Sequence, residues 1–188
     1  MRVYLSGSSR AMGEDLPYLR RMIQAINATQ ATITRNWIET ANARRIHGIK
    51  DEDADWGSIY TENIEAINRS DMAIIESTRN RFSQGFWVYA ALRNKLPTLV
   101  VTRRKEHLAL YRFSSKYITV KLYQDESELE KIISKFIKSN DVSVKDLRFN
   151  FFIDRQIYSY LREVSYETGK NKSEIIRDLL EQEIDGKG

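Results

Sequence analysis

The chain has 188 residues, of which 41% are hydrophobic and 30% charged, and its formal net charge is +4. This length allows one large domain or two small ones. The absence of cysteine excludes a disulfide framework, a thiolate metal site and a cysteine nucleophile. Because the two histidines lie far apart in the chain, we expect no bound metal, and no motif indicates a cofactor. The small positive charge permits contact with nucleic acid but does not require it.

Neither the first residues of the chain nor its apolar runs indicate a signal peptide or a membrane-spanning helix. The first residues, MRVYLSGSSR, contain no long apolar run, so we expect no signal peptide. No stretch approaches the roughly 20 apolar residues that a helix needs to span a bilayer. We therefore expect a cytoplasmic protein without a membrane partner.

Apolar runs alternate with amphipathic stretches over the first 140 residues. The runs predict strands at Arg2–Leu5, Met72–Glu76, Thr98–Thr102 and Ile118–Leu122. The amphipathic stretches predict helices at Leu16–Ile26, Ser58–Arg69, Phe86–Asn94 and Ser127–Ser139. This alternation predicts an α/β domain with a mostly parallel sheet flanked by helices. We place the domain at residues 1–138, a polar linker at 139–145 and a second module at 146–188.

Three loops are predicted to follow the carboxyl ends of the strands, where ligands of parallel sheets bind. They are Ser6–Asp15, Ser77–Gly85 and the segment after Val101. The first contains Ser6-Gly7-Ser8-Ser9-Arg10, which offers backbone N–H groups, hydroxyls and one guanidinium ahead of a helix. Such groups hold phosphates. The alternative is a tight turn with polar surface residues.

The C-terminal module changes its apolar period partway. Alternation from residue 147 to 153 predicts a strand with Leu147, Phe149, Phe151 and Ile153 on one face and Arg148, Asn150 and Phe152 on the other. Ile157, Leu161 and Val164 then recur at helical spacing, and Gly169 ends that helix. Asn171 and Glu174 have capping-box spacing and open a second helix with Ile175, Ile176, Leu179, Leu180 and Ile184.

This order of strand, helix, glycine turn and capped helix resembles the ribbon-helix-helix DNA-binding family over residues 147–184. The resemblance implies that two chains pair their strands and insert the ribbon into the major groove. Arg148, Asn150 and Phe152 would then face base edges, where arginine suits guanine and asparagine suits adenine. Phe152 departs from the family, in which this residue is usually polar.

The start of the second helix would lie on a phosphate in that arrangement. The residues concerned are Lys170, Asn171, Lys172 and Ser173. The alternative is a helical hairpin that serves dimerisation alone. Residues 141–188 contain 8 Lys and Arg against 10 Asp and Glu, so the module itself is not basic. The basic excess of 22 against 16 lies in residues 1–140.

Two N-terminal segments carry a second resemblance. VYLSGSSRAMGED and YTENIEAINRSDMAIIESTRNRFSQGFWVYAALRNKLPTLVV resemble the nucleoside 2-deoxyribosyltransferase superfamily, and within it the 2'-deoxynucleoside 5'-phosphate N-hydrolases. The resemblance covers residues 2–137. It implies cleavage or exchange of the N-glycosidic bond by a nucleophilic glutamate in a G-x-G-x-E loop, assisted by an aspartate on the preceding helix.

This sequence departs from the family at both carboxylates. Trp87 stands at the nucleophile position and Asn63 at the aspartate position. A phenolate nucleophile at Tyr89 is a remote alternative. We therefore expect no catalytic residue and no enzyme activity. The resemblance implies a nucleotide pocket formed by Gly7, Ser8, Ser9, Arg10, Asn63, Ser83, Gly85 and Trp87, in which Trp87 either stacks on a base or fills the pocket.

The acidic residues near this region have structural interpretations. Asp71 is expected to bond a backbone loop, and Glu76 to cap the end of a strand. Glu52, Asp53 and Asp55 form an acidic loop that is expected to be solvated, although one of them could reach the pocket.

Together the two halves predict a sequence-specific protein that binds double-stranded DNA, a transcriptional regulator working as a homodimer or tetramer. Its catalytically inactive nucleotide-pocket domain would sense a nucleotide monophosphate, support assembly, or both. One alternative is an active N-glycosidase or deoxyribosyltransferase with an unrecognised carboxylate. Another is an antitoxin or partition-type DNA-binding protein.

Overall fold

The chain forms two compact units, Met1–Val142 and Ser143–Gly188. The computed structural model describes residues 1–9, 12–48, 54–79, 81–111, 115–140 and 151–186. Arg10, Arg148 and Asn150 therefore lie outside the described residues.

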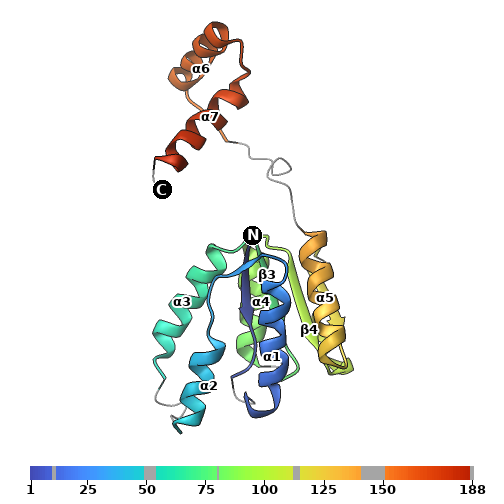
Figure 1. Ribbon diagram of the computed structural model, residues 1–188. Helices are drawn as coiled ribbons and strands as arrows, with labels where there is room; N and C mark the ends of the chain where they lie inside the picture. The colour runs from blue at the N-terminus through green and yellow to red at the C-terminus, as the bar shows by residue number, and fades with distance from the viewer. Residues whose placement is uncertain (10–11, 49–53, 80, 112–114, 141–150, 187–188) are drawn as a thin grey trace. The chain divides into compact units, whose positions relative to one another are not determined.

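A five-stranded parallel sheet forms the centre of the N-terminal unit (Figure 1). Its strands are β1 (Arg2–Ser6), β2 (Thr32–Ile33), β3 (Met72–Glu76), β4 (Thr98–Thr102) and β5 (Ile118–Leu122). They lie in the order β2-β1-β3-β4-β5, and every neighbouring pair is parallel. The predicted α/β class with a parallel sheet flanked by helices is confirmed.

Helices cover both faces of this sheet. They are α1 (Met12–Asn27), α2 (Ile38–Ile46), α3 (Trp56–Asn68), α4 (Phe82–Arg93), α5 (Glu126–Ser139) and a 3₁₀ helix, η2 (Lys105–Tyr111). The sequence did not predict β2, α2 or η2, because each is too short or too irregular to produce a periodic apolar signal. Helices α1 and α4 begin earlier than predicted, so Ser83 and Gly85 lie inside a helix and not in a loop.

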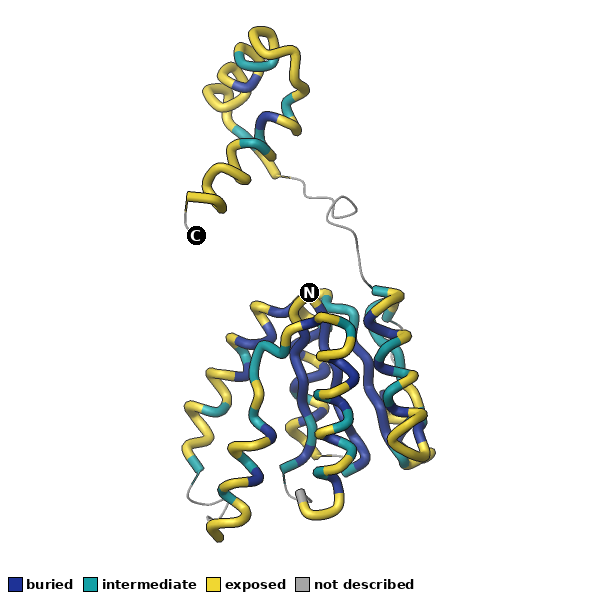
Figure 2. Tube along the Cα trace, in the orientation of Figure 1, coloured by how far each residue is buried: buried dark blue, intermediate teal, exposed yellow. Residues whose placement is uncertain are grey.

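Two apolar clusters form the core, one on each face of the sheet. Val3, Leu5, Ile74 and Val101 pack with α1 and α5, whereas Tyr4, Ile75 and Val100 pack with α3 and α4. Adjacent residues of one strand point to opposite faces, so each central strand contributes side chains to both clusters. Figure 2 shows the result: β3 and β4 are buried along their whole length.

The C-terminal unit consists of α6 (Arg155–Thr168) and α7 (Lys172–Asp185). The Asp154 side chain caps α6 by accepting a hydrogen bond from the Ile157 amide, and Gly169 ends it in the left-handed conformation at φ 70°. Asn171 and Glu174 form the capping box that their spacing predicted. Within the described part of this unit, the buried apolar residues are Leu161 and Ile175.

The strand predicted at residues 147–153 is not formed in its described portion. Residues 151–154 have no regular secondary structure, and residues 147–150 lie outside the described residues. A strand needs a hydrogen-bonded neighbour, and the predicted neighbour is the same segment of a second chain. The described residues 151–153 therefore form no strand in one chain alone.

The centre of the sheet should dominate the stability of the N-terminal unit. Ile74 in β3 is fully buried, so Ile74→Ala should lower the free energy of unfolding by about 2–5 kcal/mol. Ile46→Ala at an exposed position of α2 is the control and should change it by less than about 0.5 kcal/mol. Urea denaturation followed by tryptophan fluorescence reports this unit, because all three tryptophans lie in it. Equal losses for the two variants would contradict the assignment of the core.

Candidate functional site

Buried polar side chains gather at the carboxyl edge of the sheet. They are Ser6, Ser8, Asp15, Glu76, Ser77, Thr78, Gln84 and Thr102. Burial of a polar group costs free energy unless a hydrogen bond compensates it. Such a concentration at the edge where parallel sheets bind ligands marks this edge as the candidate site.

Glu76, the last residue of β3, is 1% exposed. Its Oε1 accepts hydrogen bonds from the Thr78 amide at 3.0 Å, from the Thr78 hydroxyl, and from the Tyr123 hydroxyl at 3.0 Å. No described residue donates a hydrogen bond to its Oε2. Burial raises the pKa of Glu76, although the hydrogen bonds from Thr78 and Tyr123 oppose the rise. The side chain is therefore a buried acid, and not only the strand-end cap that the sequence suggested.

Asp15, in the first turn of α1, is buried between two arginines. Arg79 Nε lies 3.0 Å from its Oδ2, and Arg103 contacts its Oδ1. The Arg103 guanidinium also stacks on the Tyr18 ring at 4.2 Å. Asp15 lies after β1, Arg79 after β3 and Arg103 after β4. The Asp15 carboxylate therefore connects the segments that follow these three strands.

The opposite face of the sheet holds Asn63, which the resemblance placed at the position of an assisting aspartate. Its Oδ1 accepts hydrogen bonds from the Tyr4 hydroxyl at 3.0 Å and from Arg35 Nη1 at 3.4 Å. Its Nδ2 donates to the Ile59 carbonyl at 2.7 Å. Asn63 is buried, and its amide group makes these contacts within the protein. It therefore secures α3 to β1.

Trp87 lies in an aromatic cluster and is only 9% exposed. Its ring centroid is 6.5 Å from that of Tyr4, 5.8 Å from Tyr60 and 5.0 Å from Phe86. This packing favours the interpretation in which the indole fills space within the protein over the one in which it stacks on a base. Ser83 and Gly85, which were expected beside it, are exposed on α4.

The described part of the first loop, up to Ser9, runs close to α1. A Cβ at Gly7 would lie 2.8 Å from Leu19 Cδ2, so the loop needs glycine to pass α1 closely. Ser8 is buried and Ser9 half-buried. Asp71 lies at the other edge of the sheet and accepts a hydrogen bond from the Arg2 amide at 2.7 Å.

The remaining acidic candidates are only partly described. Asp55 caps α3 by accepting a hydrogen bond from the Ser58 amide at 3.0 Å, while Glu52 and Asp53 lie outside the described residues. Among the described residues, no group of three or more His, Asp or Glu side chains is placed to hold a metal ion. No described helix is long and apolar enough to cross a membrane.

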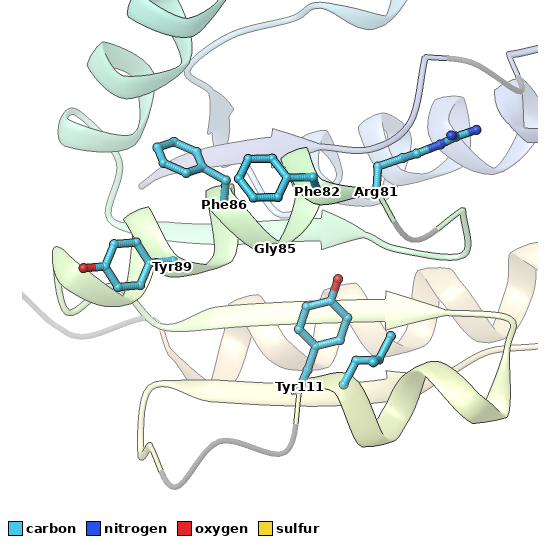
Figure 3. Close-up of a pocket in the computed structure, with 7 residues that line it drawn as sticks. Arg81, Phe82, Gly85, Phe86, Tyr89 and Tyr111 are labelled. Atoms are coloured by element: carbon cyan, nitrogen blue, oxygen red, sulfur yellow. The ribbon is translucent and has the colours of Figure 1, made fainter.

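A second opening lies between α4 and η2 (Figure 3). This groove has a volume of about 500 Å³ and is lined by Arg81, Phe82, Gly85, Phe86, Tyr89, Leu110 and Tyr111. The sequence did not predict this groove because η2 gives no periodic signal. The spacing of Phe82, Phe86 and Tyr89 along one helix face was the available signal.

The structure describes five of the predicted DNA-binding residues. Phe152 is fully exposed. Lys170 pairs with Asp178 at 2.7 Å, and Asn171 caps α7. Lys172 Nζ lies 4.9 Å from the centre of the Tyr158 ring, and Ser173 is exposed.

Comparison with known proteins identifies the fold of the N-terminal unit. The sequence matches no protein-family model and no curated protein. The structure is similar to the CMP N-glycosidase BcmB from Clostridium botulinum, with a TM-score of 0.53 and 13% identity over 72% of this chain and 99% of that one. A de novo designed Rossmann 2x3 fold protein gives a TM-score of 0.47 and 13% identity, covering 81% and 98% of the two chains.

The expectation that the chain is not an enzyme is corrected by this comparison. Its α/β fold is shared with an N-glycosidase that acts on a nucleotide, so the fold is one that enzymes use. The expectation rested on the two family positions now held by Trp87 and Asn63. It treated Glu76 only as the cap of a strand end, whereas the structure shows a buried carboxyl there.

The raised pKa of Glu76 predicts a pH-dependent stability. The neutral acid is favoured in the folded chain, so its stabilising contribution is complete below the ordinary pKa of 4.5 and is lost as the pH rises above it. The free energy of unfolding of Glu76→Gln, minus that of the unmodified chain, should therefore increase from pH 4.5 to pH 8. Urea denaturation at a series of pH values measures this difference.

Asp71→Asn is the matched control for that measurement. Asp71 precedes the same strand, but its carboxylate is exposed and lies 3.6 Å from the Arg2 guanidinium. The free energy of unfolding of Asp71→Asn, minus that of the unmodified chain, should show no such increase with pH. A flat profile for Glu76→Gln would mean that Glu76 is not held in its neutral form.

Proposed function

We propose that the chain is a DNA-binding regulator. Its C-terminal unit would pair with that of a second copy to bind double-stranded DNA, and its N-terminal unit would recognise a nucleotide monophosphate. The proposal agrees with the ribbon-helix-helix sequence pattern and with the nucleotide chemistry of a protein that shares the N-terminal fold. On this proposal, the form that binds DNA is a homodimer or a tetramer.

The observation that carries the proposal is the large exposed apolar surface of the C-terminal unit. Its exposed side chains include Phe151, Phe152, Ile157, Tyr158, Tyr160, Tyr166, Leu179, Leu180 and Ile184. A unit with two buried apolar residues is too small to be stable by its own core. A second copy offers the same apolar faces in a symmetric arrangement, which would bury both sets at once.

Paired units would direct specific residues to the DNA. The segment before α6 would supply Arg148, Asn150 and Phe152 to base edges, as its alternating pattern suggests. The start of α7 would place the amides of Lys172 and Ser173 on a phosphate, because the first amides of a helix have no acceptor within it.

Substitutions in the C-terminal unit should weaken DNA binding in two different ways. Arg148→Ala and Asn150→Ala should each cost about 1–3 kcal/mol on a selected site and far less on random DNA. Lys172→Ala should weaken both DNAs alike and reduce the salt slope by about one. Binding-site selection followed by fluorescence anisotropy at several salt concentrations measures these effects.

Lys131→Ala, at an exposed position of α5 in the N-terminal unit, serves as the charge-matched control. It should leave the affinity for the selected site unchanged. The proposal fails if no DNA is selected, or if the control loses as much affinity as Lys172→Ala.

A second candidate function is cleavage of an N-glycosidic bond, and the buried acid Glu76 favours it. Departure of a base from a sugar is helped by an acid that protonates the leaving group. We propose that the neutral Glu76 carboxyl protonates the base as the bond between the base nitrogen and the anomeric carbon breaks. Water then adds to the anomeric carbon and loses a proton to solvent, and the Glu76 carboxylate is reprotonated from solvent. Because Oε2 is buried, a substrate could reach it only if the loop around Gly7 moved. This loop passes close to Glu76, since a Cβ added to Gly7 would lie 3.5 Å from Glu76 Cβ.

Chromatography of nucleoside monophosphates incubated with the protein tests this second candidate. CMP and dCMP should release free base, and Glu76→Gln should reduce the rate at least about 100-fold, the lower range for loss of general acid catalysis. Asp71→Asn should retain the rate because that carboxylate lies at the opposite edge of the sheet. Base release unaffected by Glu76→Gln, or none above background, would exclude this role.

A further inference from the structure

The outer face of α4 exposes aromatic rings that no described element covers. Phe82 is 91% exposed and Tyr89 is 58% exposed, and Phe86 lies half-buried between them. The three recur at the i, i+4, i+7 spacing of a single helix face. A concentrated apolar patch on a soluble domain usually marks a binding surface.

The 3₁₀ helix η2 forms the other wall of this groove. It contributes Leu110, which is exposed, and Tyr111, whose ring is buried and whose hydroxyl lies 2.6 Å from Ser77 Oγ. Figure 3 shows the Tyr111 side chain reaching from its own segment toward α4. The volume of about 500 Å³ lies within the range of small-molecule pockets.

One cation lines the groove. Arg81 immediately precedes α4 and is exposed, and no described residue pairs with its guanidinium. The neighbouring arginines differ: Arg79 pairs with Asp15, and Arg104 with Glu106 at 2.7 Å. Arg81 is therefore available to an anion that enters from solvent.

We propose that this groove is the nucleotide-binding site, with the base stacked on Phe82 and Phe86 and the phosphate on Arg81. The inference rests on the proposed function, since it gives the nucleotide recognised by the N-terminal unit a place outside the carboxyl edge. Phe86 lies five residues after Arg81, a rise of about 7 Å along the helix. That span suits the distance between the phosphate and the base of a monophosphate.

The chemistry of the lining favours this ligand over a purely apolar partner. Stacking on aromatic rings accepts any base, and a guanidinium binds phosphate with two parallel hydrogen bonds. Trp87 does not compete for the base, because its ring is buried beneath Phe86 in the aromatic cluster. Its closeness to Phe86 makes it a fluorescent reporter of the groove.

Titration of the full chain with CMP, cytidine and inorganic phosphate, followed by tryptophan fluorescence and calorimetry, tests the inference. CMP should bind saturably and more tightly than cytidine. Arg81→Ala should weaken CMP about tenfold or more while leaving cytidine nearly unchanged. Phe82→Ala should weaken both ligands at least about fivefold. Arg93→Ala, an exposed arginine at the other end of α4, should change neither affinity.

Gly85 permits a sharper variant. Outside its chain neighbours and its own helix backbone, a Cβ added there meets nothing within 4 Å, and Gly85 lines the groove. Gly85→Leu should therefore fold and place its side chain in the groove. It should abolish CMP binding without lowering the thermal midpoint. Normal CMP affinity in folded Gly85→Leu would overturn the inference.

Other outcomes separate this inference from the function on which it rests. CMP binding that survives Arg81→Ala and Gly85→Leu but is lost in Ser9→Ala would place the nucleotide at the first loop, leaving the proposed function intact. If sedimentation shows that Phe82→Ala dissociates an oligomer and CMP affinity is unchanged, the groove is an interface between copies. Absence of CMP binding in a chain that still selects DNA would overturn the inference and limit the proposed function to DNA binding.

Discussion

The buried carboxylate of Asp15 organises the carboxyl edge of the sheet. By contacting Arg79 and Arg103, it connects the segments that follow β1, β3 and β4. A buried ion pair contributes little net stability, but loss of one partner is costly because it leaves an uncompensated charge. The three segments are therefore held together, and the polar residues around Glu76 are fixed relative to the first loop.

Two faces of this edge have different chemistry. Glu76 and its partners Thr78 and Tyr123 lie on the side of the sheet that α1 and α5 cover, because Tyr123 packs in that cluster. Asn63 and Trp87 belong to the opposite side, where the described contacts are aromatic packing and amide hydrogen bonds. The N-terminal unit thus shares its fold with an N-glycosidase, and its buried acid Glu76 lies at the end of β3.

The C-terminal unit poses a different physical problem. Its helices are well capped at both starts and its turn uses a left-handed glycine, so local interactions define each helix. These local interactions do not supply a core, since most of its large apolar side chains remain exposed. In the proposed pairing of two copies, association would bury these side chains and couple the folding of this unit to the oligomeric state of the chain.

The sequence by itself determined the elements with strong periodic signals. β1, β3, β4 and β5 and the capping box at Asn171 and Glu174 were all predicted correctly, because a buried strand or a helix start depends on adjacent residues. Only the tertiary structure showed η2, the groove beside α4, and the burial of Glu76 and Trp87. These features depend on contacts between side chains that are distant in the sequence. Such contacts leave no local pattern from which they could be predicted.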